Sequence, residues 1–99
     1  MAQYDLYPAP GGGGYLLDVQ SDWIGILDTR VVVPLVPEGE VRAAARGLNP
    51  RVEVDGVPFV LATQLLAAVP ARLLKMPMGN LSGRAEEITR ALDLVLHGF

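Results

Sequence analysis

The sequence predicts a mainly β fold, a compact antiparallel barrel or sandwich with one C-terminal α-helix packed against it. Three observations predict it. Short strand-like segments are closely spaced along the 99 residues, turns rich in Gly, Pro and Asp separate them, and the one long segment with helical periodicity is residues 82–99. A chain of this length forms a single domain with one modest core, and no internal repeat or long linker divides residues 1–99.

The first half of the chain is predicted to form a hairpin followed by a buried strand. Residues 3–7 alternate polar and apolar side chains, and residues 15–19 are again strand-like after a stretch of prolines and glycines. The glycine run 11–14 lacks the lysine and hydroxyl residue of a phosphate-binding loop. Residues 20–29 read as an irregular connection, and residues 30–36 as a β-branched strand.

The second half begins with a short helix and continues with further strands. Residues 40–46 have alanine-rich helical propensity for a turn or two. The clearest hairpin covers residues 52–59, because its turn is an Asp-Gly dipeptide, which favours a type I′ turn. Residues 59–69 are apolar enough for a strand that continues into a second one. Met76 and Met78 are interpreted as side chains that fill gaps in the core.

The predicted helix over residues 82–99 carries the expected signals at its start. Ser82 is a plausible N-cap, and Glu86 and Glu87 lie in the first turn, where the helix dipole favours negative charge. Arg90 follows Glu86 by four residues and is expected to pair with it. The last turns carry more apolar surface than a small core needs, so part of it is expected to contact another chain.

The composition favours a protein-binding function over direct binding of nucleic acid. The 8 basic and 11 acidic residues give a net charge of −3, the wrong sign for a protein that holds phosphates by summed charge. The basic residues form no run, although folding could cluster some of them, so an RNA-binding alternative stays open. The 51% hydrophobic content is high for so short a chain and favours a homodimer that buries an apolar patch.

The sequence also limits location and chemistry. No apolar run reaches the roughly 20 residues that span a bilayer, and the start lacks the pattern of a signal peptide, so we expect a cytoplasmic protein. There is no cysteine for disulfides or zinc, and a catalytic triad or metal site would depend on the single histidine, His97. The spacing of Asp18, Asp22 and Asp28 matches no calcium loop, and these are interpreted as solvated acids or turn caps. We expect no catalytic residue, cofactor or metal.

Four segments occur in a distinctive order along the chain: Leu17-Asp18-Val19-Gln20-Ser21-Asp22, Val31-Val32-Val33-Pro34-Leu35, Ala67-Ala68-Val69-Pro70 and Asn80-Leu81-Ser82. In these segments and their order the chain resembles the CcdB toxins. The resemblance covers nearly the whole chain and implies an SH3-like barrel of the CcdB and MazF type. It also implies a homodimeric toxin of a type II toxin–antitoxin system. Such a toxin binds the A subunit of DNA gyrase, traps it while its DNA is cleaved, and is neutralised by a CcdA-like antitoxin.

The resemblance places one part of the gyrase contact at the end of the chain. The family ends in Trp-Gly-Ile, which falls here on His97, Gly98 and Phe99, so only the glycine matches. Asp93 and Leu96, one turn earlier on the predicted helix, are weaker candidates for the same contact.

The second part of the implied contact falls on Ser21, Asp22, Trp23 and Ile24, where Trp23 stands in place of a common aliphatic residue. A lone tryptophan fits a core anchor as well as an interface residue. If this segment meets the helix end, Trp23 would supply the aromatic face that the smaller imidazole of His97 lacks.

Two other functions stay open at this point. The MazF and Kid toxins, which resemble this architecture, cleave RNA with an arginine and polar groups that stabilise a pentacovalent phosphorus. Arg30 and Thr29 would be the local candidates for that role. The chain could also be a divergent CcdB relative that no longer acts on gyrase, since His97 and Phe99 depart from the family ending.

Overall fold

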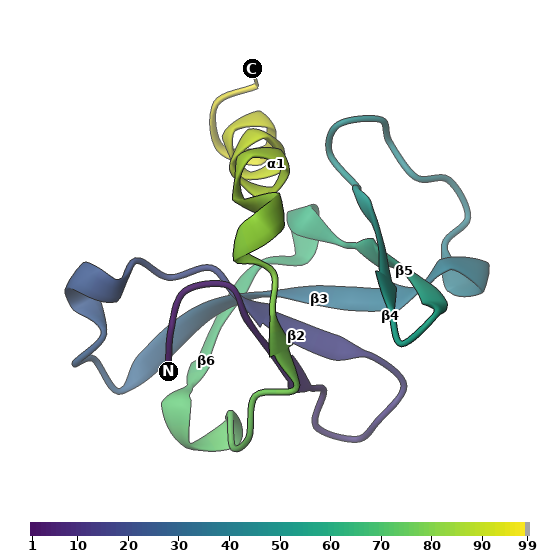
Figure 1. Cartoon of the computed structure of the whole chain (residues 1–99). Helices are drawn as coiled ribbons and strands as arrows, with labels where there is room; N and C mark the ends of the chain where they lie inside the picture. The colour runs from purple at the N-terminus through teal and green to yellow at the C-terminus, as the bar shows by residue number, and fades with distance from the viewer. Residues whose placement is uncertain (99) are drawn as a thin grey trace.

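The computed structural model describes residues 1–98 and shows a curled antiparallel sheet, a half-barrel, with one helix standing over it (Figure 1). The strands are β1 (Asp5–Pro8), β2 (Tyr15–Asp18), β3 (Thr29–Pro37), β4 (Arg51–Val54), β5 (Val57–Leu61), β6 (Ala67–Pro70) and β7 (Gly79–Asn80). The α-helix is α1 (Ala85–His97), and the short 3₁₀ turns are η1 (Asp22–Ile24), η2 (Glu38–Glu40), η3 (Thr63–Leu65), η4 (Ala71–Leu73) and η5 (Ser82–Arg84). The predicted mainly β fold with a C-terminal helix is confirmed.

Strand β3 is the centre of the sheet. Its valine-rich sequence suits a strand that is covered on both faces. One edge of β3 pairs with β2, from Asp18 opposite Val32 to Tyr15 opposite Leu35. The other edge pairs first with β6 and then with β5, so that one long strand joins both halves of the chain.

The outer edge of β1 is closed by β7, which comes from far along the sequence. Asp5 lies opposite Asn80, and Leu6 opposite Gly79. The Asn80 side chain adds a hydrogen bond from Nδ2 to the Asp5 carboxylate, with an N–O distance of 2.9 Å. The start of the described chain is therefore held in place by residues 79–80.

The two faces of β3 pack against different apolar clusters, because successive strand residues point to opposite sides. Val33 and Leu35 belong to the main core beneath α1, to which the helix contributes Ile88, which is 1% exposed. Val32 faces the other side and packs in a smaller cluster with Tyr7 and Leu74. The amphipathic helix thus covers one face of the sheet only.

Helix α1 begins three residues later than predicted. Residues 82–84 form the 3₁₀ turn η5, and Ser82 caps no α-helix; instead its N–H donates to the Asn80 side chain at 2.8 Å. The α-helix begins at Ala85 with no side-chain cap and ends at His97, and Phe99 lies outside the described residues. Within residues 1–98, no helix is long and apolar enough to cross a membrane.

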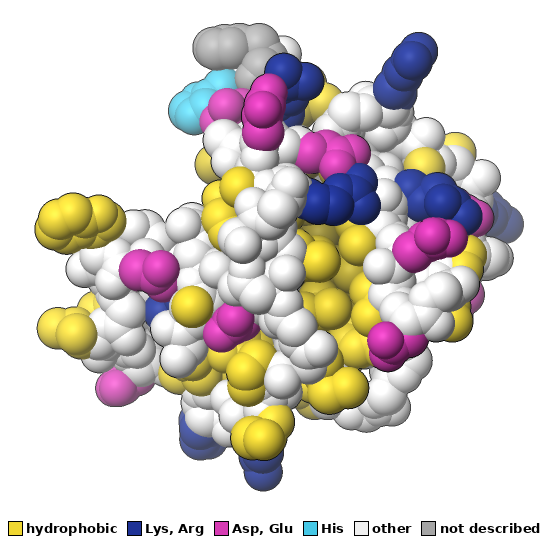
Figure 2. Space-filling view, viewed as in Figure 1, with side chains coloured by type: hydrophobic (Ala, Val, Ile, Leu, Met, Phe, Trp, Pro, Cys, Tyr) yellow, Lys and Arg dark blue, Asp and Glu magenta, His cyan; other side chains and the backbone are white. Residues whose placement is uncertain are grey.

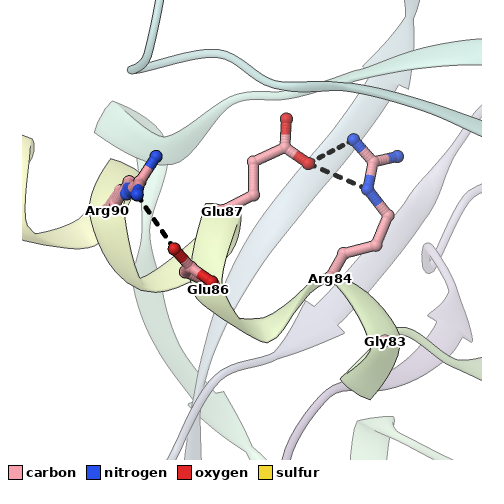
Figure 3. Close-up of a pocket in the computed structure, with 5 residues that line it drawn as sticks. All are labelled: Gly83, Arg84, Glu86, Glu87 and Arg90. Carbon is pink, nitrogen blue, oxygen red and sulfur yellow. Dashed lines mark hydrogen bonds and ion pairs between the residues drawn. The ribbon is translucent and has the colours of Figure 1, made fainter.

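Ion pairs fix the first turns of α1 (Figure 3). Glu86 and Arg90 pair at 2.9 Å, which confirms the predicted i to i+4 contact. Arg84 pairs with Glu87 and also donates from Nη2 to the Arg51 carbonyl at 2.9 Å. The start of the helix is thereby tied to β4.

The prediction of a short helix over residues 40–46 is wrong. The 3₁₀ turn η2 ends at Glu40, and Val41 is extended. The side chain of Asn49 accepts a hydrogen bond from the Ala45 N–H at 2.9 Å and donates to the Leu61 carbonyl at 3.0 Å. A segment this short does not offset the cost of helix nucleation, and Asn49 offers its backbone another partner.

The hairpin around Asp55 and Gly56 is confirmed, with both residues at positive φ, 53° and 79°. Gly56→Ala is expected to lower the free energy of unfolding by about 1–2 kcal/mol, because an L side chain is strained at that φ even where space is free. Chemical denaturation measures the change. Gly39→Ala is the matched control, since Gly39 is equally open and lacks a positive φ; equal losses in both variants would contradict the prediction.

Candidate functional site

The connection between β2 and β3 carries the most exposed apolar side chains of the described chain. Trp23 and Ile26 are each 95% exposed, and Ile24 and Leu27 are about half exposed. We call residues 21–27 the apolar loop; its hydrophobic side chains project at the left of Figure 2. The interpretation of Trp23 as a core anchor is therefore wrong. Exposed apolar groups gathered on one loop are typical of a surface that binds a partner.

Hydrogen bonds hold the apolar loop in one conformation. Ser21 Oγ accepts from the Trp23 N–H at 3.2 Å, and Asp22 Oδ1 accepts from the Gln3 N–H at 2.8 Å. The side chain of Gln20, which is 5% exposed, donates to the Ile24 carbonyl at 2.9 Å and accepts from the Val31 N–H at 3.0 Å. Such preorganisation lowers the entropy that the loop would lose on binding a partner.

A buried ion pair lies beneath this loop. Arg30 is 1% and Asp18 0% exposed, and the Asp18 Oδ2 lies 2.8 Å from Arg30 Nε and 2.7 Å from Nη2. The Arg30 Nη1 has no hydrogen-bond partner among residues 1–98. A Cβ added to Gly25 would lie 3.4 Å from this nitrogen, so the loop turns directly over the guanidinium. The buried Asp18–Arg30 pair therefore supports the apolar loop from the side of the core.

Burial raises the pKa of the Asp18 carboxyl, while the hydrogen bond and charge of Arg30 oppose that rise. Asp18 is therefore not a solvated acid, but its Oδ1 accepts from the Gln20 N–H at 3.0 Å, so the interpretation of it as a turn cap is confirmed. The sequence signal was weak: an acid at the end of one strand and an arginine at the start of the next meet only if the two strands pair antiparallel. Sequence reasoning consequently missed the group that positions the loop.

The end of α1 forms a second exposed surface. Asp93, Leu96 and His97 are exposed on its last turns, and Leu96 is 61% exposed. Gly98 has a φ of 81° and donates from its N–H to the Leu94 carbonyl at 3.0 Å. This left-handed cap suits the glycine that the resemblance places there. Phe99, the third terminal candidate, lies outside the described residues.

The apolar loop and the helix end lie apart in the structure. Figure 1 places η1 beside the start of β3 and the end of α1 above the sheet. Figure 2 shows the outline notched between the hydrophobic side chains of the loop and the cyan His97. The expectation that Trp23 would stand in for an aromatic ring at position 97 by meeting the helix end is therefore not supported. A partner that touches both surfaces must span the notch.

The residues considered for RNA cleavage do not form a catalytic site. Thr29 is exposed, but Arg30 is buried in its pair with Asp18, so its guanidinium cannot reach a phosphate on the surface. The cleft beside the start of α1, about 490 Å³, is lined by Gly83, Arg84, Glu86, Glu87 and Arg90 (Figure 3). Its two arginines pair with its two glutamates, which leaves no unpaired charge for a phosphate.

Comparisons with known proteins agree with this geometry. The family model described as CcdB protein matches residues 3–98. Among solved structures, an endoribonuclease from mycobacterial species aligns with a TM-score of 0.77 and 14% sequence identity, over 97% of this chain and 90% of that chain. At that identity the likeness shows the shared fold alone. No curated protein sequence matches.

Proposed function

Since the chain belongs to the CcdB family and is thereby a toxin of a toxin–antitoxin system, we propose that it binds the A subunit of DNA gyrase and poisons the enzyme. A poison of this kind stabilises one conformation of its target, so differential affinity supplies the whole effect. It needs a well-formed surface and no catalytic centre. The net charge of −3 is compatible with a protein target.

The observation that carries the proposal is the indole of Trp23, which is 95% exposed on a loop that hydrogen bonds and the buried Asp18–Arg30 pair hold in place. An aromatic side chain displayed in this way is a typical interface anchor. Ser21 and Ile24 flank it, and Asp93, Leu96, His97 and Gly98 form the second exposed surface at the end of α1. These are seven of the nine residues that the resemblance places at the gyrase contact. Of the other two, Asp22 lies in the same loop, and Phe99 is proposed from the resemblance alone.

The proposed assembly is a cytoplasmic homodimer with a CcdA-like antitoxin as its second partner. A two-fold dimer carries both surfaces twice. The antitoxin would neutralise the toxin by binding in a way that excludes gyrase.

An RNA-cleaving function is the second candidate, because the mycobacterial neighbour of the same fold is named an endoribonuclease. The burial of Arg30 favours the gyrase proposal over this one. The third candidate is a divergent CcdB relative that no longer acts on gyrase.

Induction of the chain in a bacterial host separates the three candidates. We expect growth arrest with accumulation of cleaved DNA complexes and intact RNA, and we expect that an excess of a gyrase A fragment restores growth. Cut RNA without cleaved DNA complexes would replace the proposal with the endoribonuclease. Normal growth, with expression of the chain confirmed, would favour the third candidate, a divergent CcdB relative that does not act on gyrase.

A further inference from the structure

A second apolar surface lies on the opposite side of the sheet from α1. A groove of about 370 Å³ is lined by Pro8, Pro10, Leu73, Lys75, Met76 and Met78. Met76 is 74% exposed, and Met78 and Leu73 are also exposed. The interpretation of both methionines as core gap-fillers is therefore wrong. We call these six residues the methionine groove.

The groove side chains are held facing outward. Leu74 is buried in the cluster with Tyr7 and Val32, which anchors the segment between its exposed neighbours. The Met78 N–H donates to the Leu6 carbonyl at 2.6 Å, and the Ala71 N–H donates to the Asp28 carbonyl at 2.7 Å. With both ends and the middle fixed, the methionines cannot fold back into the core.

The charge around the groove is positive, although the protein as a whole is acidic. Residues 56–85 contain no Asp or Glu. Arg72 and Lys75 are exposed, and neither belongs to any ion pair within the described part of the chain. In Figure 2 basic and hydrophobic side chains stand together at the lower edge of the molecule, where Figure 1 places the segment after β6.

We propose that the methionine groove docks a peptide segment of a partner protein that combines apolar side chains with acidic ones. Methionine side chains adapt to varied apolar groups, and Lys75, the one charged residue that lines the groove, would pair with a carboxylate of the partner. A second copy of this chain fits less well, because two positive rims would face each other. A bilayer surface is flat and cannot enter a groove. The proposal is independent of gyrase, because the groove and the apolar loop share no residue.

Selection from a displayed library of random peptides of about 16 residues, four helical turns in length, tests this partner chemistry. The intact chain is the target. We expect enrichment of sequences rich in Asp, Glu and large apolar residues. One enriched peptide is then synthesised with a fluorophore, and its affinity is measured by anisotropy. Met76→Glu and Lys75→Glu are each expected to weaken binding about tenfold or more, and added salt should weaken it further.

Val57→Glu is the matched control, since Val57 is also an exposed apolar residue but lies on the β4–β5 hairpin. Equal melting temperatures of the three variants and the parent show that the fold is kept. The proposal is overturned by no enrichment, by enrichment of basic peptides, or by equal binding to all variants. It is also overturned if Met76→Glu abolishes self-association in sedimentation, or if the chain binds anionic phosphatidylglycerol vesicles through Met76.

Discussion

Asp18→Asn is expected to lower the free energy of unfolding by about 3–5 kcal/mol, because it leaves the buried Arg30 guanidinium with only the exposed Asp22 carboxylate, 4.0 Å away, as a counter-charge. The pair itself contributes little net stability, since burial raises the pKa of Asp18 and so opposes its ionised form. The cost comes from stranding a cation that is 1% exposed. For a domain of this size the melting temperature should fall by at least about 12 °C, measured by circular dichroism.

Glu86→Gln is the matched control, because the Glu86–Arg90 pair has similar chemistry but is more than three-quarters exposed. Its expected cost is no more than about 0.5 kcal/mol. The double variant Asp18→Leu with Arg30→Met removes both buried charges and should be more stable than Asp18→Asn. An Asp18→Asn variant as stable as Glu86→Gln would show that Arg30 finds another way to satisfy its charge.

Trp23→Ala is expected to weaken binding to the gyrase A fragment by roughly 30-fold or more, which corresponds to about 2 kcal/mol for an aromatic anchor. The variant should unfold at the same temperature as the parent, because Trp23 is 95% exposed. The backbone N–H at position 23 still donates to Ser21 Oγ, so the loop keeps its conformation. Titration calorimetry measures the affinity, and accumulation of cleaved DNA complexes reports the effect in cells.

Met76→Ala is the control for this experiment. Met76 is also exposed and apolar, but it lies in the methionine groove, so its removal should leave gyrase affinity unchanged. Unchanged affinity in Trp23→Ala would remove the apolar loop from the proposed contact. An equal loss in both variants would show that general hydrophobicity, and not the loop, determines binding.

Most of the fold could be predicted because its signals are local. The Asp-Gly turn at residues 55–56 determines the register of its hairpin, and the alternation in residues 3–7 together with the strand-like residues 15–19 indicates the first hairpin. The helix at the end of the chain could be predicted because its apolar residues recur with helical periodicity. Ser82 is not the cap because residues 82–84 form the 3₁₀ turn η5, which moves the start of the α-helix to Ala85.

The candidate site was less predictable because its geometry depends on contacts between distant residues. Asp18 and Arg30 are twelve positions apart and meet only once β2 and β3 pair. The Arg30 guanidinium lies directly beneath Gly25 of the loop, and Trp23 on the same loop is 95% exposed. Composition alone allows Trp23 to lie either in the core or on the surface.

The pairing of β1 with β7 also has a consequence for how the toxin is made. Residues 5–6 must wait for residues 79–80 before the outer edge of the sheet is closed, and α1 follows only after that. While the chain emerges from the ribosome, its first hairpin therefore has an unpaired edge and its core has no cover. The finished surface appears late in translation, so a partly made chain is expected to be harmless to the cell that makes it.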